Sequence, residues 1–188
     1  MREPLLESFL RAQRLNRVLP YIKSYQNCEL LDIGCGWEAR LLKEVEPYIH
    51  RGFGVDFKAP KILTDKIHTI SATLEDSLPF EDASFDLITL LAVLEHLDHP
   101  LPILRECARL LRPGGAILLT VPSWRAKPVL EFLAFRLGIV SADEIRDHKR
   151  YFNREDLFEL LGEVDSLSIK RHEYFQFGFN NQLVAIKK

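Results

Sequence analysis

A glycine turn that directly follows an apolar strand is the feature that most constrains this fold. Residues 30–36 read Leu-Leu-Asp-Ile-Gly-Cys-Gly, and Asp56 stands 22 positions after Gly34. Gly34 and Gly36 allow backbone conformations that a side chain disfavours, and they let a ligand approach the chain closely. An acid at this distance ends the second strand of a βαβ unit, where its carboxylate can accept hydrogen bonds from both hydroxyls of a ribose. The pair predicts a pocket for a nucleotide-type cofactor; the alternative is a tight turn with an unrelated, solvated aspartate.

Length and composition predict a single domain spanning residues 1–188. With 188 residues, of which 47% are hydrophobic, the chain has material for one substantial core. The formal net charge is only −2, and the basic residues are dispersed along the chain. Nucleic-acid binding usually needs a concentrated basic surface, so no nucleic-acid partner is expected.

Cysteine usage and the absence of long apolar runs predict a cytoplasmic location. The cysteines Cys28, Cys35 and Cys107 form no Cys-x-x-Cys pair, which argues against a disulfide framework and against a zinc knuckle. The N-terminus is charged, and no apolar run approaches the length of a membrane span. Neither a signal peptide nor a transmembrane segment is expected.

Apolar runs alternate with helical patterns along the first 122 residues, which is typical of βαβ units and a parallel sheet. An N-terminal helix is expected within residues 1–27, from about Leu5 to Tyr25. Pro113-Gly114-Gly115 is expected to end the helix before the fifth strand. The pattern predicts strands at 29–33, 52–56, 67–72, 85–90 and 116–121, with helices at 39–46 and 102–111.

The C-terminal part of the chain has a different pattern. A helix at 154–161 is followed by strands at 167–175 and 182–186, which a turn at Phe177–Asn181 connects. This is the pattern of a hairpin, so one antiparallel strand is expected to join the sheet at its edge.

Residues 123–150 are predicted to form a lid-like insertion after the fifth strand. Its helical portion, Pro128–Leu137, is apolar around most of its circumference, more than one buried stripe requires. The insertion follows a strand whose carboxyl end should face the ligand cleft of an open α/β sheet. Val129–Leu137 is therefore expected to act as a lid contact or as a surface for a second copy in a homodimer.

Four motifs make the chain resemble the class I S-adenosylmethionine-dependent methyltransferases. The resemblance covers almost the whole chain from Leu30 onward. It implies an α/β fold, a Rossmann-like doubly wound seven-stranded sheet that is mostly parallel with an antiparallel last strand, and an enzyme whose cofactor is S-adenosyl-L-methionine. The motifs are Leu31-Asp32-Ile33-Gly34-Cys35-Gly36, Gly54-Val55-Asp56, Leu78-Pro79-Phe80 with Phe85-Asp86, and Leu111-Arg112-Pro113-Gly114-Gly115.

The resemblance also implies which residues bind the cofactor. The methionine end is expected at Asp32, at the backbone of Gly34, Cys35 and Gly36, and along Leu91 and Ala92. The adenosine end is expected at Asp56 for the ribose, Phe57 for the adenine face, and Thr73, Leu74 and Glu75 for the adenine edge.

The chain departs from the family pattern at two positions. Glu38 stands where the glycine turn normally has a third glycine, and Thr73 or Leu74 stands where an aspartate commonly meets the adenine amino group. A glutamate at a helix start is favoured by the helix dipole, and the Thr73 hydroxyl can accept one hydrogen bond. Either departure would weaken cofactor affinity if the side chain did not fit.

A nicotinamide dehydrogenase is the rival interpretation within the same kind of fold. Gly34-x-Gly36-x-x-Ala39 satisfies the dinucleotide fingerprint with alanine at its last position. Asp32 argues against it, because a carboxylate two residues before the first glycine would repel phosphates but attract the ammonium group of a methionine moiety.

Two histidines are the candidate catalytic residues. Methyl transfer from a sulfonium needs a general base only when the acceptor is a poorly acidic hydroxyl or a protonated amine. His96 follows the fourth strand and His148 follows the insertion, and either could take a proton, although a loop histidine is more often structural. No metal site is expected, because there is no His-x-x-x-His and the group His96, Asp98 and His99 lacks the spacing of a zinc site.

These observations leave three functional hypotheses. The first is a methyltransferase acting on a small-molecule acceptor, because the insertion is too short for a macromolecular recognition domain. The second is a methyltransferase acting on a hydrophobic acceptor of the lipid or quinone type, for which the apolar helix would form the port. The third is a cofactor-binding partner subunit without catalysis, suggested by Glu38 and the missing adenine aspartate.

Overall fold

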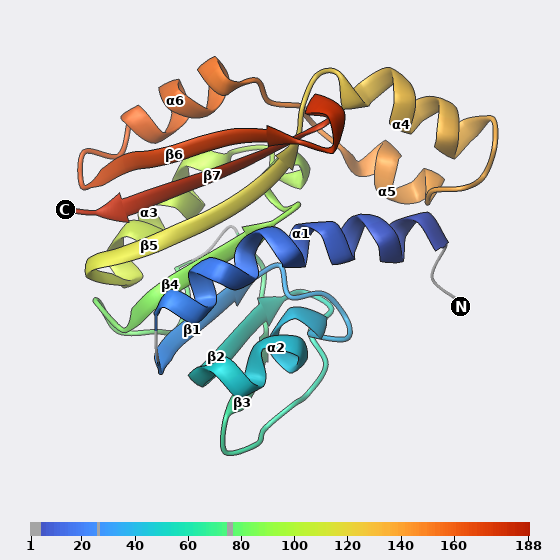
Figure 1. Ribbon diagram of the computed structural model, residues 1–188. Helices are drawn as coiled ribbons and strands as arrows, with labels where there is room; N and C mark the ends of the chain where they lie inside the picture. The colour runs from blue at the N-terminus through green and yellow to red at the C-terminus, as the bar shows by residue number, and fades with distance from the viewer. Residues whose placement is uncertain (1–4, 26, 75–76) are drawn as a thin grey trace.

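The computed structural model describes residues 5–25, 27–74 and 77–188, and it contains one seven-stranded sheet (Figure 1). The strand order is β3-β2-β1-β4-β5-β7-β6. Every neighbouring pair from β3 to β5 is parallel, whereas β7 is antiparallel to both of its neighbours. The strands are β1 (Cys28–Ile33), β2 (Ile49–Asp56), β3 (Ile67–Ser71), β4 (Phe85–Leu91), β5 (Leu111–Pro122), β6 (Leu167–Phe175) and β7 (Asn180–Lys187). The predicted α/β, doubly wound sheet is confirmed.

Helices cover both faces of this sheet (Figure 1). α1 (Leu5–Ser24) and α2 (Arg40–Val45) pack on one face, and α3 (Pro100–Leu110) and α6 (Arg154–Gly162) pack on the other. Short 3-10 turns, η1 (Glu46–Tyr48), η2 (Leu94–His96) and η3 (Gln176–Gly178), lie in the connections. No helix among the described residues has the length and apolarity that crossing a bilayer would need.

The side chains of β1 alternate between two apolar clusters, one on each face of the sheet. Leu31 and Ile33 join the cluster beneath α3 and α6, whereas Leu30 joins the cluster beneath α1 and α2. All six residues of β1 are buried. A strand buried on both faces needs a nearly continuous apolar sequence, which is why this segment could be recognised from the sequence.

The predicted position of the antiparallel strand was wrong. β7 does not lie at the sheet edge but between β5 and β6, and β6 forms the edge. The reason is burial: Leu183, Val184 and Ala185 in β7 are almost fully buried, whereas in β6 only the two end residues, Leu167 and Phe175, are buried. The more apolar strand of the hairpin therefore occupies the interior position.

The segment Pro113-Gly114-Gly115 is also placed differently from the prediction. α3 ends at Leu110, and β5 already begins at Leu111, so the three residues lie within the strand. The register between β4 and β5 shifts there, and Gly114 has φ +80°. A left-handed glycine of this kind is typical of an irregular strand start.

Residues 123–150 contain two helices that lie beyond the carboxyl end of β5 (Figure 1). They are α4 (Ala126–Phe135), two residues earlier than predicted at each end, and α5 (Ala142–Asp147), which the sequence did not predict. Several large apolar side chains of α4 and the turn after it are exposed, namely Val129, Phe132, Phe135, Leu137 and Ile139. The insertion therefore stands over the edge of the sheet at which ligands of open α/β folds bind.

Candidate active site

The glycine turn after β1 is held against the end of β2. The backbone N–H groups of Gly34 and Cys35 both donate to the carbonyl of Val55, at 2.8 and 3.2 Å. Gly34 and Gly36 both adopt left-handed conformations, with φ +77° and +68°. The turn that the sequence predicted is therefore present, and it depends on two residues that tolerate positive φ.

The two glycines meet different surroundings. A Cβ atom at Gly34 would lie 2.4 Å from Cγ2 of Val93, so a side chain cannot be accommodated there. A Cβ at Gly36 would have no atom within 4 Å. Gly34 therefore permits close packing inside the protein, and Gly36 leaves open space in which a ligand can approach the backbone.

Asp32 places a buried carboxyl group immediately before this turn. Its side chain is 3% exposed, and its Oδ1 accepts a hydrogen bond from the Thr89 hydroxyl at 2.7 Å. Burial raises the pKa of Asp32 to about 7, and the negative charge of Asp56 contributes in the same direction, while the Thr89 hydrogen bond opposes the shift. A buried carboxylate that lacks a cationic partner is a strong acceptor for an ammonium group.

Asp56 lies at the end of β2 and connects this strand to the glycine turn. Its Oδ2 accepts from the N–H of Gly36 at 3.0 Å, and its Oδ1 accepts from the N–H of Lys58 at 2.8 Å. Each carboxylate oxygen has a further lone pair, so these bonds leave capacity for ribose hydroxyls. The neighbouring Phe57 ring is 65% exposed and is available to contact an adenine face.

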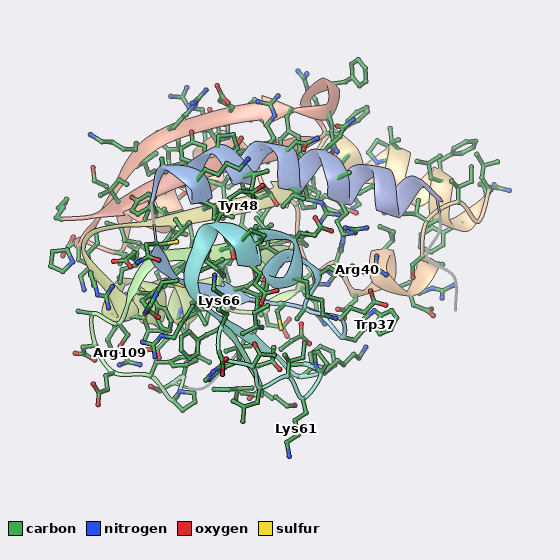
Figure 2. The ribbon with its side chains drawn as sticks, turned by 60° about the horizontal axis from the view of Figure 1, so that its bottom comes forward. Trp37, Arg40, Tyr48, Lys61, Lys66 and Arg109 are labelled. Atoms are coloured by element: carbon green, nitrogen blue, oxygen red, sulfur yellow. The ribbon has the colours of Figure 1, made fainter. Side chains whose placement is uncertain are left out.

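The two departures from the family pattern have different outcomes. Glu38 bonds to Arg40 on α2, so its charge is paired with a neighbouring cation. Figure 2 labels Arg40 and also Trp37, which is 62% exposed on the glycine turn. Thr73 and Leu74 follow β3 as expected, whereas Glu75 lies outside the described residues. The two described positions, Thr73 and Leu74, therefore offer no carboxylate for the adenine edge.

Leu91 ends β4, and Ala92 follows it directly. Ala92 has φ +60° and donates its N–H to the carbonyl of Thr120 at 2.8 Å. A left-handed alanine is strained, and such residues persist where the surrounding structure fixes the backbone. This conformation turns the chain sharply into η2, which carries the next group of polar residues.

Two adjacent side chains of η2, Glu95 and His96, meet the distant His148. The rings of His96 and His148 have centroids 4.9 Å apart. One potential ligand atom from each of Glu95, His96 and His148 lies within 4.8 Å of those of the other two. The structure thus brings the two predicted histidines together, while Asp98 and His99 are exposed and are not part of this cluster.

Glu95 is a site residue whose importance the sequence did not reveal. Its side chain is 1% exposed, and its Oε2 has no hydrogen-bond partner among the described residues. Burial raises the pKa of Glu95 to about 8, against smaller lowering effects from its own backbone N–H and from Arg14. Because glutamate is usually exposed, only the tertiary structure identifies this carboxyl as buried.

Burial also affects His148. It lowers the pKa of His148 to about 4, with a smaller lowering from the nearby His96 and Arg14 and an opposing effect of Asp147. The Nδ1 of His148 lies 3.3 Å from the hydroxyl of Tyr151, and the Nδ1 of His96 lies 2.9 Å from Oδ2 of Asp147. Each ring therefore has its Nδ1 engaged, and neither Nε2 has an identified hydrogen-bond partner among the described residues.

The residues at the carboxyl ends of β1 and β2 fit S-adenosylmethionine. The carboxyl of Asp32 suits its ammonium group, the open space at Gly36 suits a close backbone approach, and Asp56 suits its ribose. The same residues suit a pyrophosphate poorly, because Asp32 and Asp56 would both repel it. The dehydrogenase interpretation is therefore disfavoured by the geometry.

Comparisons with known proteins agree with this geometry. Residues 31–119 match a family model described as a methyltransferase domain. A ubiquinone biosynthesis O-methyltransferase of Vibrio parahaemolyticus is 24% identical over 163 residues, covering 81% of this chain and 69% of that protein. The corresponding protein of Idiomarina loihiensis is 30% identical over 155 residues, covering 70% of this chain and 58% of that protein.

Solved structures share the whole architecture. A putative methyltransferase of Haloferax volcanii, solved with the Trm112 methyltransferase activator, has a TM-score of 0.70 at 16% identity and covers 100% of this chain and 99% of that chain. The 1,6-didemethyltoxoflavin-N1-methyltransferase of Burkholderia thailandensis, solved with S-adenosylhomocysteine, has a TM-score of 0.70 at 17% identity, covering 93% and 78%. Residues 31–119 are therefore similar to a methyltransferase domain, and the chain has the same fold as these solved methyltransferases, which agrees with the fold that the sequence predicted.

Proposed function

We propose that this protein transfers the methyl group of S-adenosylmethionine to a small-molecule acceptor. The observation that carries the proposal is the buried carboxyl of Asp32 beside the open glycine turn at Gly36. The acceptor would lie over the carboxyl ends of β4 and β5, beneath the insertion at residues 123–150. These strand ends are the part of an open α/β sheet where ligands are bound.

The protein's part in this reaction is mainly to hold and align. The cofactor, when bound, supplies a methyl group on a positively charged sulfur. Asp32 would fix the ammonium group, Asp56 the ribose, and the left-handed backbone at Ala92 would border the methionine portion. α4 and α5 would exclude water from the acceptor, so that nucleophile and methyl group remain in line.

An acceptor of the phenol or quinone type is the more specific proposal. It is supported by the exposed apolar side chains of α4, including Phe132 and Phe135, and by relatives whose names state ubiquinone biosynthesis O-methylation. A phenolic hydroxyl must lose its proton during transfer. His148 and His96 remain the predicted proton acceptors, since His96 lies in η2 after β4 and the His148 ring packs against it.

Calorimetric titration tests cofactor binding directly. Wild-type protein should bind S-adenosylmethionine and S-adenosylhomocysteine and should not bind NADH. Asp56→Ala should weaken binding by about tenfold to a hundredfold, because it removes a charge-assisted acceptor for the ribose and frees the N–H of Gly36. Asp65→Ala, an exposed acid between β2 and β3, is the matched control and should bind as the wild type does. NADH binding that displaces S-adenosylmethionine would contradict the assignment.

Acceptor screening tests the chemistry once the cofactor is established. Release of S-adenosylhomocysteine should be detected with phenols or catechols carrying apolar substituents, and not with amines or short carboxylates. Turnover confined to amines would contradict the phenol-type proposal while leaving the methyltransferase intact. Tight cofactor binding without turnover on any acceptor, together with copurification of a second protein, would favour the partner-subunit hypothesis instead.

A further inference from the structure

We propose that Glu95, His96 and His148 form a binding site for a divalent transition-metal ion of the zinc type. The ion would join the end of the insertion at residues 123–150 to the turn that follows β4. This inference does not depend on the identity of the acceptor, because the residues and their geometry are present in the chain without any ligand.

The first argument is the convergence of three ligand types at one point. One candidate ligand atom from each residue lies within 4.8 Å of the other two. Atoms bound to one zinc ion at about 2.0–2.2 Å lie roughly 3–4 Å from one another in a tetrahedral arrangement, so small side-chain adjustments bring this set to a common centre. Two imidazoles and one carboxylate are a ligand set found in catalytic zinc sites.

The second argument is that both histidines already have the outer partners that a metal-binding histidine needs. Oδ2 of Asp147 lies 2.9 Å from Nδ1 of His96, which fixes that nitrogen as the donor and leaves Nε2 with a free lone pair. The Tyr151 hydroxyl lies 3.3 Å from Nδ1 of His148. A carboxylate behind a histidine orients the ring and increases its basicity toward a metal.

The third argument is the unsatisfied carboxyl of Glu95. The Glu95 side chain is only 1% exposed, and its Oε2 has no hydrogen-bond partner among the described residues. An unpaired buried carboxyl oxygen costs free energy, and buried charges are normally paired or coordinate a metal. The two neighbouring imidazoles, those of His96 and His148, do not compensate the charge of this carboxylate when they are neutral. A bound cation would satisfy this oxygen.

Arg14 of α1 is the one described cation whose charge acts on both Glu95 and His148. It opposes cation binding, whereas Glu95 and Asp147 favour it. A divalent ion with two carboxylates and one guanidinium nearby leaves a local charge of about +1, within the range that zinc sites with two histidines and one carboxylate tolerate.

The ion would strengthen a contact that the backbone already makes. The N–H groups of Lys149 and Arg150 donate to the carbonyl of Glu95 at 2.8 and 3.3 Å, and the Arg150 guanidinium donates to the carbonyl of Asp98. The segment after α5 is thus docked on the turn after β4. A metal shared by His148 and Glu95 would hold the end of the insertion docked on the turn after β4.

Metal coordination and proton transfer use the same nitrogen lone pairs. If His96 and His148 bind an ion, neither ring can accept the acceptor's proton at the same time. Added zinc should therefore affect stability and turnover in opposite directions. Occupation of the site would increase thermal stability, and it would slow any turnover that depends on a histidine base.

The test uses the full chain, stripped with a chelator and titrated with Zn²⁺ by calorimetry and with Co²⁺ by visible absorption. One ion per chain is expected, with a visible Co²⁺ spectrum free of thiolate bands, because the cluster of Glu95, His96 and His148 contains no cysteine. Mg²⁺ should bind weakly, since it prefers oxygen ligands. Zn²⁺ should also raise the melting temperature.

Variants decide whether the ion binds at this cluster. His148→Ala and Glu95→Gln should each lower Zn²⁺ affinity at least about a hundredfold, and Asp147→Asn about tenfold, as loss of an outer partner typically does. His99→Ala removes an exposed histidine near the same turn and should leave binding unchanged. Circular dichroism of every variant checks the fold. Absence of Zn²⁺ binding to folded wild-type protein, or unchanged binding in folded His148→Ala and Glu95→Gln, would overturn the proposal.

Discussion

Replacing Asp32 with asparagine is expected to lower S-adenosylmethionine affinity at least about a hundredfold and, at the same time, to make the cofactor-free protein more stable. Losing one partner of a buried ion pair typically costs about 3–5 kcal/mol, which accounts for the affinity change. The stability gain arises because the carboxylate is buried without a cationic partner, and burial raises the pKa of Asp32 to about 7. Asparagine keeps the size of the side chain and an oxygen that can accept from Thr89.

The pH dependence follows from the sign of that shift. Because the pKa of Asp32 is raised in the folded protein, the folded state binds the proton more tightly than the unfolded state, whose carboxyl titrates near its ordinary value. The cofactor-free wild type should therefore lose stability as pH rises from about 4 to about 7, by roughly 2–4 kcal/mol. Asp32→Asn should not show this loss, so the two proteins differ most at neutral pH.

Cofactor binding should have the opposite dependence. The ammonium group is attracted only by the ionised carboxylate, so wild-type affinity should fall about tenfold for each pH unit below the pKa of about 7. Urea unfolding and calorimetry at several pH values measure both effects on the same samples. A less stable Asp32→Asn protein that still binds the cofactor would show that this carboxyl is structural and does not contact the ligand.

Replacing Gly34 with alanine is expected to destabilise the protein by about 3 kcal/mol, because two costs act together. A Cβ at this position would lie 2.4 Å from Cγ2 of Val93, and the residue has φ +77°. Gly36→Ala is the matched control, since its φ of +68° imposes a similar backbone cost with no atom within 4 Å. Gly36→Ala should cost about 1 kcal/mol of stability but should weaken cofactor binding, because its Cβ enters the open space.

A double-mutant cycle separates the steric cost from the backbone cost. Val93→Ala removes the side chain that Gly34→Ala would strike, so the double variant should lose less stability than the sum of the single variants. Chemical denaturation of the four proteins measures the coupling. Equal losses for Gly34→Ala and Gly36→Ala, with no coupling to Val93, would show that the turn relaxes away from β4 and that the close contact does not constrain it.

Local features of the chain were predictable because they depend on neighbouring residues. The buried strand β1, the turn at Gly34 and Gly36 and the acid ending β2 occupy one continuous segment, and each residue type has a direct physical reason for its place. The bounds of β3, β4, α6 and β6 also agree with the apolar pattern within one or two residues.

Features that depend on competition between segments were not predictable. The hairpin strands were recognised, but their order in the sheet was not, because it depends on which strand is buried on both faces. The start of β5 at Leu111 was missed because glycines and proline usually end a helix, while here they form an irregular strand start paired to β4.

The sequence by itself determined the local structure at the ends of β1 and β2, and only the tertiary structure decided which polar groups meet after β4. Strand, turn, helix and acid follow one another within about thirty residues, as a βαβ unit requires, so their pattern already specifies this local structure. Glu95 and His148 are separated by an entire strand, helix and insertion, and nothing in their spacing indicates that they meet. Their proximity, and the burial that changes the pKa of both, arises when the segment after α5 docks on the turn after β4. Long-range docking depends on the summed packing of the whole core, which no local pattern encodes.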